Sequence, residues 1–131
     1  MSGYADPELL VADWLRDLLS VKTWTDPRLP PNWAFTAPIA HIQRGASLGA
    51  LPLTLDDVTL DIDVYAGDAD TARDTQNAIW SAMETKLPLT TFGNGAFVRQ
   101  VQTLTRPMWT PDPRVYRRTA AYRLVLHAVT S

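Results

Sequence analysis

Six aspartates within a short segment are the densest set of chemically active groups in the sequence. The segment DVTLDIDVYAGDADTARD, residues 57–74, carries them at positions 57, 61, 63, 68, 70 and 74. Carboxylate oxygens are the ligands that hard divalent cations prefer, so a metal site is the first hypothesis. The EF-hand template fails, because no frame that starts at Asp61 or Asp68 supplies its ligand residues. Asp61 and Asp63 remain a pair that could bind Mg²⁺ with help from elsewhere.

The spacing of the same segment favours a structural interpretation. Even positions 58, 60, 62 and 64 are aliphatic, whereas the odd positions from 57 to 65 are Asp, Thr, Asp, Asp and Tyr. This alternation predicts a half-buried strand whose acidic face is solvated. Asp68 or Asp70 then caps a helix over about 69–87. Acidic side chains in the first turn of this helix are stabilised by the positive end of the helix dipole. Replacing both Asp61 and Asp63 by asparagine should therefore leave folding nearly intact.

Other candidate catalytic groups are weaker. The pentapeptide GASLG, residues 45–49, matches the nucleophile elbow G-x-S-x-G with Ser47 as nucleophile, but Pro52 and a strand-like run follow instead of a helix. His41 and His127 each stand alone, and the chain has no cysteine for thiol catalysis or disulfides. We expect no catalytic residue, metal or cofactor. A small metal-dependent enzyme using Asp61 and Asp63 is the distant alternative.

The composition suits one domain over residues 1–131. The chain is 46% hydrophobic and has a formal net charge of -2, so it lacks the basic excess that drives nucleic-acid binding. Its densest basic cluster is Arg114, Arg117, Arg118 and Arg123. No export signal or membrane span is recognisable, and we expect a soluble protein that is made and used without export.

The remaining pattern completes an α+β fold. We expect a helix over about 7–20, an extended piece over 21–25, a strand over 34–45 with Pro38 at an edge or bulge, a strand from 97 closed by Pro107, and a strand over about 115–129. These elements predict a four- to five-stranded, mostly antiparallel sheet with two helices packed on one face. The segments flanking the second helix are expected to pair in parallel. The residues expected to face the helices are Val58, Leu60, Ile62, Val64, Tyr122, Leu124 and Leu126.

A leucine-rich connector and one tryptophan are the candidate interface residues. The run LGALPLTL, residues 48–55, places Leu48, Leu51 and Leu53 between two predicted strands, where polar residues are usual. The run either contacts another chain or folds over its own core. Trp14 and Trp80 fit a core, whereas Trp109 adjoins a proline-rich loop and is either an anchor or an interface residue.

Three segments together carry a family resemblance. They are DPELLVADWLRDLL (6–19), VTLDIDVYAGDADTARDTQNAIWSAM (58–83) and VYRRTAAYRLVLHAV (115–129). Their order resembles tail terminator proteins of long-tailed phages, especially those that infect actinobacteria. The proline-rich 26–38 segment and the leucine-rich connector do not match that pattern.

The resemblance implies a structural virion protein, not an enzyme. Such subunits form a ring of six on the finished tail tube, stop its growth and present a surface to the head connector. The implied partners are further copies, the tail tube protein and a head-completion or connector protein. DNA would pass through the lumen without specific binding, and no membrane is involved. The alternative is another head-to-tail joining component, such as a connector adaptor or head-closure protein.

Overall fold

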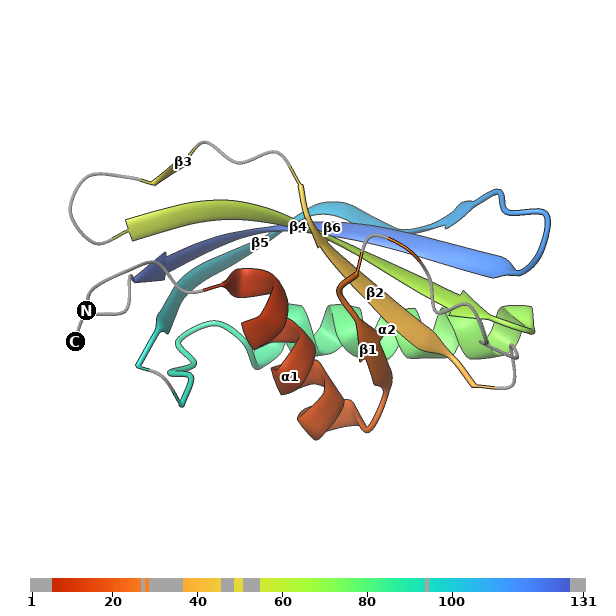
Figure 1. Ribbon diagram of the computed structural model, residues 1–131, viewed down its shortest axis with the longest axis horizontal. Helices are drawn as coiled ribbons and strands as arrows, with labels where there is room; N and C mark the ends of the chain where they lie inside the picture. The colour runs from red at the N-terminus through yellow and green to blue at the C-terminus, as the bar shows by residue number, and fades with distance from the viewer. Residues whose placement is uncertain are drawn as a thin grey trace.

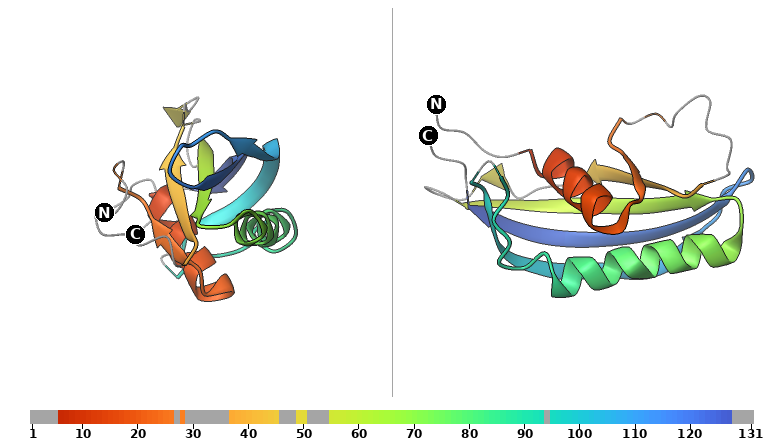
Figure 2. Two further views of the ribbon diagram at one scale, coloured as in Figure 1. Left: turned by 90° about the vertical axis from the view of Figure 1, so that its right-hand side faces the viewer. Right: turned by 90° about the horizontal axis from the view of Figure 1, so that it is seen from below.

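The computed structural model describes residues 6–26, 28, 37–45, 49–50, 55–93 and 95–127. In chain order the elements are α1 (Pro7–Leu19), β1 (Lys22–Trp24), β2 (Ile39–Arg44), β3 (Gly49–Ala50), β4 (Leu55–Ala66), α2 (Ala69–Thr85), β5 (Phe97–Thr110) and β6 (Tyr116–His127). Five strands form a mixed, mostly antiparallel sheet in the order β1-β2-β4-β6-β5, and β3 pairs with β4 (Figure 1). Both helices lie on one face of this sheet (Figure 2), which confirms the predicted α+β fold.

The helices begin where their capping residues predict. The Asp6 carboxylate accepts hydrogen bonds from two backbone N–H groups of the first turn of α1, and Pro7 occupies the first helical position. Ser20, with a left-handed φ of 56°, ends this helix. Asp68 caps α2 by accepting a hydrogen bond from the backbone N–H of Thr71 at 2.8 Å. Each helix ends one or two residues before its predicted end.

The hydrophobic core lies between the sheet and the two helices. Val11 and Leu15 of α1 and Ile79 and Met83 of α2 are fully buried in it. They pack with Ala120 and with the β4 and β6 residues that alternation assigned to this face, namely Val58, Leu60, Ile62, Val64, Tyr122, Leu124 and Leu126. Each large aliphatic side chain buried here contributes about 1.5–3 kcal/mol. Trp14 and Trp80 pack partly buried against this core, as predicted.

A buried glutamine joins α2 to two strands. Gln76 is fully buried, and its Nε2 donates hydrogen bonds of 2.8 Å to the carbonyl oxygens of Ile62 in β4 and Arg118 in β6. These bonds replace the contacts of the amide nitrogen with water, whereas the amide oxygen Oε1 is buried without a hydrogen-bond partner within the described residues. Gln76 therefore fixes the position of α2 over these neighbouring strands.

The predicted parallel pairing of the segments that flank α2 is wrong. β4 and β5 run parallel to each other, but β6 lies between them and is antiparallel to both. Residues 111–115 form a short connection that lets β5 and β6 pair as a hairpin, and β6 pairs with β4 over the full length of both strands. The parallel pair among the described residues is β1 with β2.

The positions of two prolines relative to their strands differ from the prediction. Pro107 does not close its strand, since β5 continues to Thr110. β5 is an edge strand with register shifts between Thr103 and Thr105 and between Thr105 and Met108, where a missing N–H costs little. Pro38 immediately precedes β2 instead of lying within a strand. Residues 34–36 of that predicted strand lie outside the described residues.

Candidate interaction surface

Two aspartates of β4 form ion pairs with arginines of β6 on the sheet face opposite the helices. Arg123 donates from Nε and Nη2 to the two carboxylate oxygens of Asp57, at 2.9 and 2.5 Å. Arg117 donates from Nη2 to Asp63 at 2.6 Å. In both pairs the arginine lies two residues before the β6 residue directly opposite the aspartate, so one diagonal cross-strand geometry occurs twice.

These pairs correct the prediction of a solvated acidic face. Asp57 is 3% exposed and Asp63 is 7% exposed, whereas Asp61 between them is exposed as predicted. The guanidinium of Arg117 also lies over the Tyr65 ring, 5.4 Å from its centroid, and Tyr65 is itself buried. Alternation separates the two faces of a strand, but it does not show whether the polar face is covered. Replacing Asp61 and Asp63 together is therefore no longer expected to be neutral.

The local electrostatics distinguish the aspartates. The hydrogen bonds from Arg123 hold the pKa of Asp57 below its usual value. Asp61 makes no such ion pair within the described residues. Partial desolvation raises its pKa, with a smaller contribution from the charge of Asp63. β4 thus carries Asp57, whose ionised form is stabilised by an arginine, and Asp61, whose ionised form is disfavoured by its surroundings.

The geometry gives no support to a cation site at Asp61 and Asp63. One oxygen of Asp63 is bound to Arg117, so a cation there would meet a guanidinium. Within the described residues no group of three or more His, Cys, Asp or Glu side chains could hold a metal ion. Ser47, the other candidate from the sequence, lies outside the described residues.

Trp109 lies in a cluster of aromatic and guanidinium groups, hereafter the Trp109 cluster, consisting of Arg73, Trp109, Tyr116 and Arg118. The Cζ atoms of Arg73 and Arg118 lie 5.5 and 4.8 Å from the Trp109 ring centroid. The Tyr116 ring meets Trp109 edge-on, with centroids 6.3 Å apart. Trp109 is 39% exposed and Tyr116 49% exposed. Tryptophan, tyrosine and arginine are the residues that dominate the binding energy of protein interfaces.

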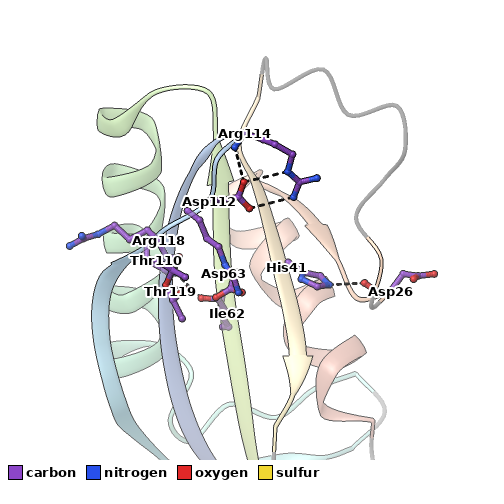
Figure 3. Close-up of polar contacts among 11 residues, drawn as sticks. Asp26, His41, Ile62, Asp63, Thr110, Asp112, Arg114, Arg118 and Thr119 are labelled. Atoms are coloured by element: carbon purple, nitrogen blue, oxygen red, sulfur yellow. Dashed lines mark hydrogen bonds and ion pairs between the residues drawn. The ribbon is translucent and has the colours of Figure 1, made fainter.

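A groove of about 720 Å³ opens beside this cluster. Its walls come from the connection between β4 and α2 and from the β5–β6 hairpin, including Pro111 and Pro113. Arg114 on the hairpin donates hydrogen bonds to the Asp112 carboxylate and lowers its pKa (Figure 3). Apolar rings and guanidinium groups occur together along the groove. This combination suits an apolar side chain that lies next to a carboxylate.

The structure describes only part of the predicted interface. Trp109 lies within β5, not in a loop, whereas Leu48, Leu51 and Leu53 lie outside the described residues. Within the connector, Gly49 pairs with Asp57 near the start of β4, while Trp109 pairs with Arg118, which lies opposite Val64 near its end. The described strand within the connector and the Trp109 cluster are therefore at opposite ends of β4.

The two histidines have packing contacts. His41 is 7% exposed, and its Nε2 lies 2.6 Å from the carbonyl oxygen of Asp26, joining β2 to the segment after β1 (Figure 3). The His127 ring lies 5.7 Å from the centroid of the Phe97 ring on the neighbouring strand. Both contacts are structural, and neither histidine lies in a group of metal-ligating side chains within the described residues.

Sequence reasoning missed three members of the Trp109 cluster. Arg118 was noted only as part of a basic run, and Arg73 and Tyr116 were not selected. A usable signal was present, because aromatic residues flank the TPDP turn at positions 109 and 116 and a hairpin brings such positions close together. Arg73 joins them only through the packing of α2.

Neither helix in the described part of the chain is long and apolar enough to cross a lipid bilayer. No model of a protein family matches the sequence, and no curated protein matches it.

Proposed function

We propose that this protein is a phage tail terminator, in which identical subunits form a ring that caps the tail tube. The ring, with six subunits as the resemblance implies, would stop tube polymerisation and join the tail to the head connector. The observation that carries the proposal is the Trp109 cluster, which exposes two aromatic rings beside two guanidinium groups. Such a surface is typical of the centre of a protein interface.

The segments that carry the resemblance correspond to structural elements. Residues 6–19 contain α1, residues 58–83 contain most of β4 and α2, and residues 115–129 contain β6. Together they supply most of the hydrophobic core. The resemblance therefore rests on the scaffold, and the interface residues are a separate observation that supports the same function.

The proposed partners follow from the position of such a ring. They are neighbouring copies, the tail tube protein and a head-completion or connector protein, and the ring would lie at the head-proximal end of the tail. DNA would pass through the lumen without specific binding, in agreement with a formal net charge of -2 that does not favour phosphate contacts.

The direct test uses purified tail tubes of the corresponding phage. We expect the wild-type protein to bind one end of each tube as a ring, visible by electron microscopy, and to block elongation when tube protein is added. Trp109→Asp should weaken capping by at least about thirtyfold, as expected for loss of an interface hot spot. Leu104→Asp is the matched control, because Leu104 is 48% exposed on the same strand and lies outside the cluster.

Circular dichroism should show that both variants remain folded. A wild-type protein that never binds tube ends would refute the terminator function. Binding to isolated connectors without any capping of tubes would instead identify another head-to-tail joining protein. Equal capping by the Trp109 and Leu104 variants would remove the Trp109 cluster from the interface.

A further inference from the structure

The Trp109 cluster carries a positive charge that the described residues do not neutralise. Arg73 has a partner on its own helix, since it lies 3.1 Å from Asp70. Arg118 makes no ion pair within the described part of the chain, and its Nε is buried without a hydrogen-bond partner. Burial and the like charge of Arg73 lower the pKa of Arg118. A carboxylate supplied from outside would relieve both effects.

The outer face of α1 has the complementary character. Leu9 is 51% exposed, and the side chains of Asp13 and Asp17 are 61% and 79% exposed. These three residues are spaced by four, so they form one stripe along the helix. Arg16 is the cation between the two aspartates, at 3.1 and 3.7 Å, which leaves the stripe with a net negative charge.

The two surfaces lie toward opposite edges of the sheet. α1 packs against β1, β2, β4 and α2, but not against β5 or β6, which carry Trp109, Tyr116 and Arg118. β1 and β5 are the two edge strands of the sheet (Figure 1). One copy therefore presents an acidic and apolar stripe on one side and an aromatic and cationic cluster on the other. Two different, complementary patches are what a head-to-tail contact requires.

We propose that the outer face of α1 of one copy docks onto the Trp109 cluster of the next copy. Leu9 lies against the exposed aromatic rings, and Asp13 and Asp17 approach Arg118 and its neighbour Arg73. This contact rests on the proposed ring, since it names the surfaces through which identical subunits meet. A contact repeated in this way leaves one free patch at each end of a row of subunits until the row closes on itself.

Disulfide trapping tests the contact without tail tubes, because the chain contains no cysteine of its own. Leu9→Cys and Tyr116→Cys in one chain should give, on mild oxidation, a ladder of trapped dimers, trimers and larger species on a non-reducing gel. The control replaces Leu9→Cys by Leu18→Cys. Leu18 is also exposed on α1, at 39%, but nine residues are about 2.5 helical turns, so it lies on the opposite side of the helix.

Charge reversal in the Leu9→Cys, Tyr116→Cys variant then tests the proposed ion pairs between the two copies. Adding Arg118→Glu should reduce the rate of trapping by at least about tenfold, because like charges would meet across the contact. Adding Asp13→Arg and Asp17→Arg as well should restore the ladder. If Arg118→Glu alone fails to fold by circular dichroism, the two α1 substitutions alone should reduce trapping by a similar factor, since they change only exposed residues.

The proposal is overturned if the Leu9 pair gives no ladder, if the Leu18 control traps equally well, or if charge reversal has no effect. A normal tube-capping result with any of these outcomes would retain the terminator function and exclude the α1 contact. It would then assign the Trp109 cluster to an acidic segment of another protein. Efficient trapping without tube capping would support the α1 contact and refute the terminator function.

Discussion

Arg117 and Arg118 are neighbours in sequence but belong to two different regions of the molecule. Arg117 lies on the sheet face opposite the helices and donates to the buried carboxylate of Asp63 at 2.6 Å. Arg118 points away from Asp63 (Figure 3). It stacks on the exposed ring of Trp109 and has no carboxylate partner among the described residues. A guanidinium matched within its own chain helps to specify the fold, whereas an unmatched one beside exposed aromatic rings is available to a partner.

The most severe test of this comparison places a carboxylate in the hydrophobic core instead of on the polar face of β4. Ile62 is fully buried in the core on the helix-facing side of β4. Ile62→Asp should lower the free energy of unfolding by about 4 kcal/mol or more, which approaches the whole stability of a small domain. Urea denaturation followed by circular dichroism measures this. Asp61→Ala should change it by less than about 0.5 kcal/mol, and equal losses would mean that the strand faces are assigned wrongly.

Removing a carboxylate that is paired with an arginine should cause the next largest loss in the free energy of unfolding. Asp57→Ala leaves Arg123 without its partner, and because the Arg123 side chain is 39% exposed and can be solvated, the expected loss in the free energy of unfolding lies below the range for fully buried pairs. A double mutant with Arg123→Met should recover part of that loss, because no unpaired charge remains. Losses that simply add in the double mutant would show that the pair does not act as a unit.

The two neighbouring arginines should differ in stability and in association. Arg118→Ala removes only a stacked cation, so the expected loss in the free energy of unfolding is about 1 kcal/mol or less. Arg117→Ala leaves Asp63 unpaired at a side-chain exposure of 11%, and should cost about 2–3 kcal/mol. Thermal or urea unfolding of the two variants gives the comparison. A larger loss from Arg118→Ala would indicate that this arginine supports the fold instead of an interface.

The smallest expected effects concern the pH dependence of the free energy of unfolding, to which Asp57 and Asp61 contribute with opposite signs. The lowered pKa of Asp57 stabilises the fold above the unfolded-state pKa, near 3.8, and this contribution is lost as the pH falls through the lower folded-state pKa. The raised pKa of Asp61 has the opposite sign, so its cost is present at pH 7 and disappears as the pH falls toward 3.8.

Asp61→Asn should therefore raise the free energy of unfolding at pH 7 by a few tenths of a kcal/mol, and this advantage should vanish in acid. Asp57→Asn should lower stability at pH 7 and differ less from wild type below the unfolded-state pKa. Urea unfolding at several pH values between 3 and 7 measures both trends. Two variants with the same sign at neutral pH would contradict the proposed electrostatic difference.

The sequence by itself determined the local elements of this protein. Asp6 and Asp68 marked the helix starts, and the aliphatic residues at alternate positions of β4 and β6 identified the face that packs against the helices. These features were predictable because capping and alternation act between residues close in sequence. The α+β class followed from their order. Of the Trp109 cluster, only Trp109 was among the predicted interface residues, and the predicted interface leucines 48, 51 and 53 lie outside the described residues.

Only the tertiary structure decided which strand lies between β4 and β5 and which charges meet. Asp57 pairs with an arginine 66 residues away and Asp63 with one 54 residues away, so both pairs depend on the register between distant strands. The Trp109 cluster likewise combines residues of α2, β5 and β6. Alternation assigns a side chain to a face, but the partner that covers it is set by long-range packing, which no local pattern encodes.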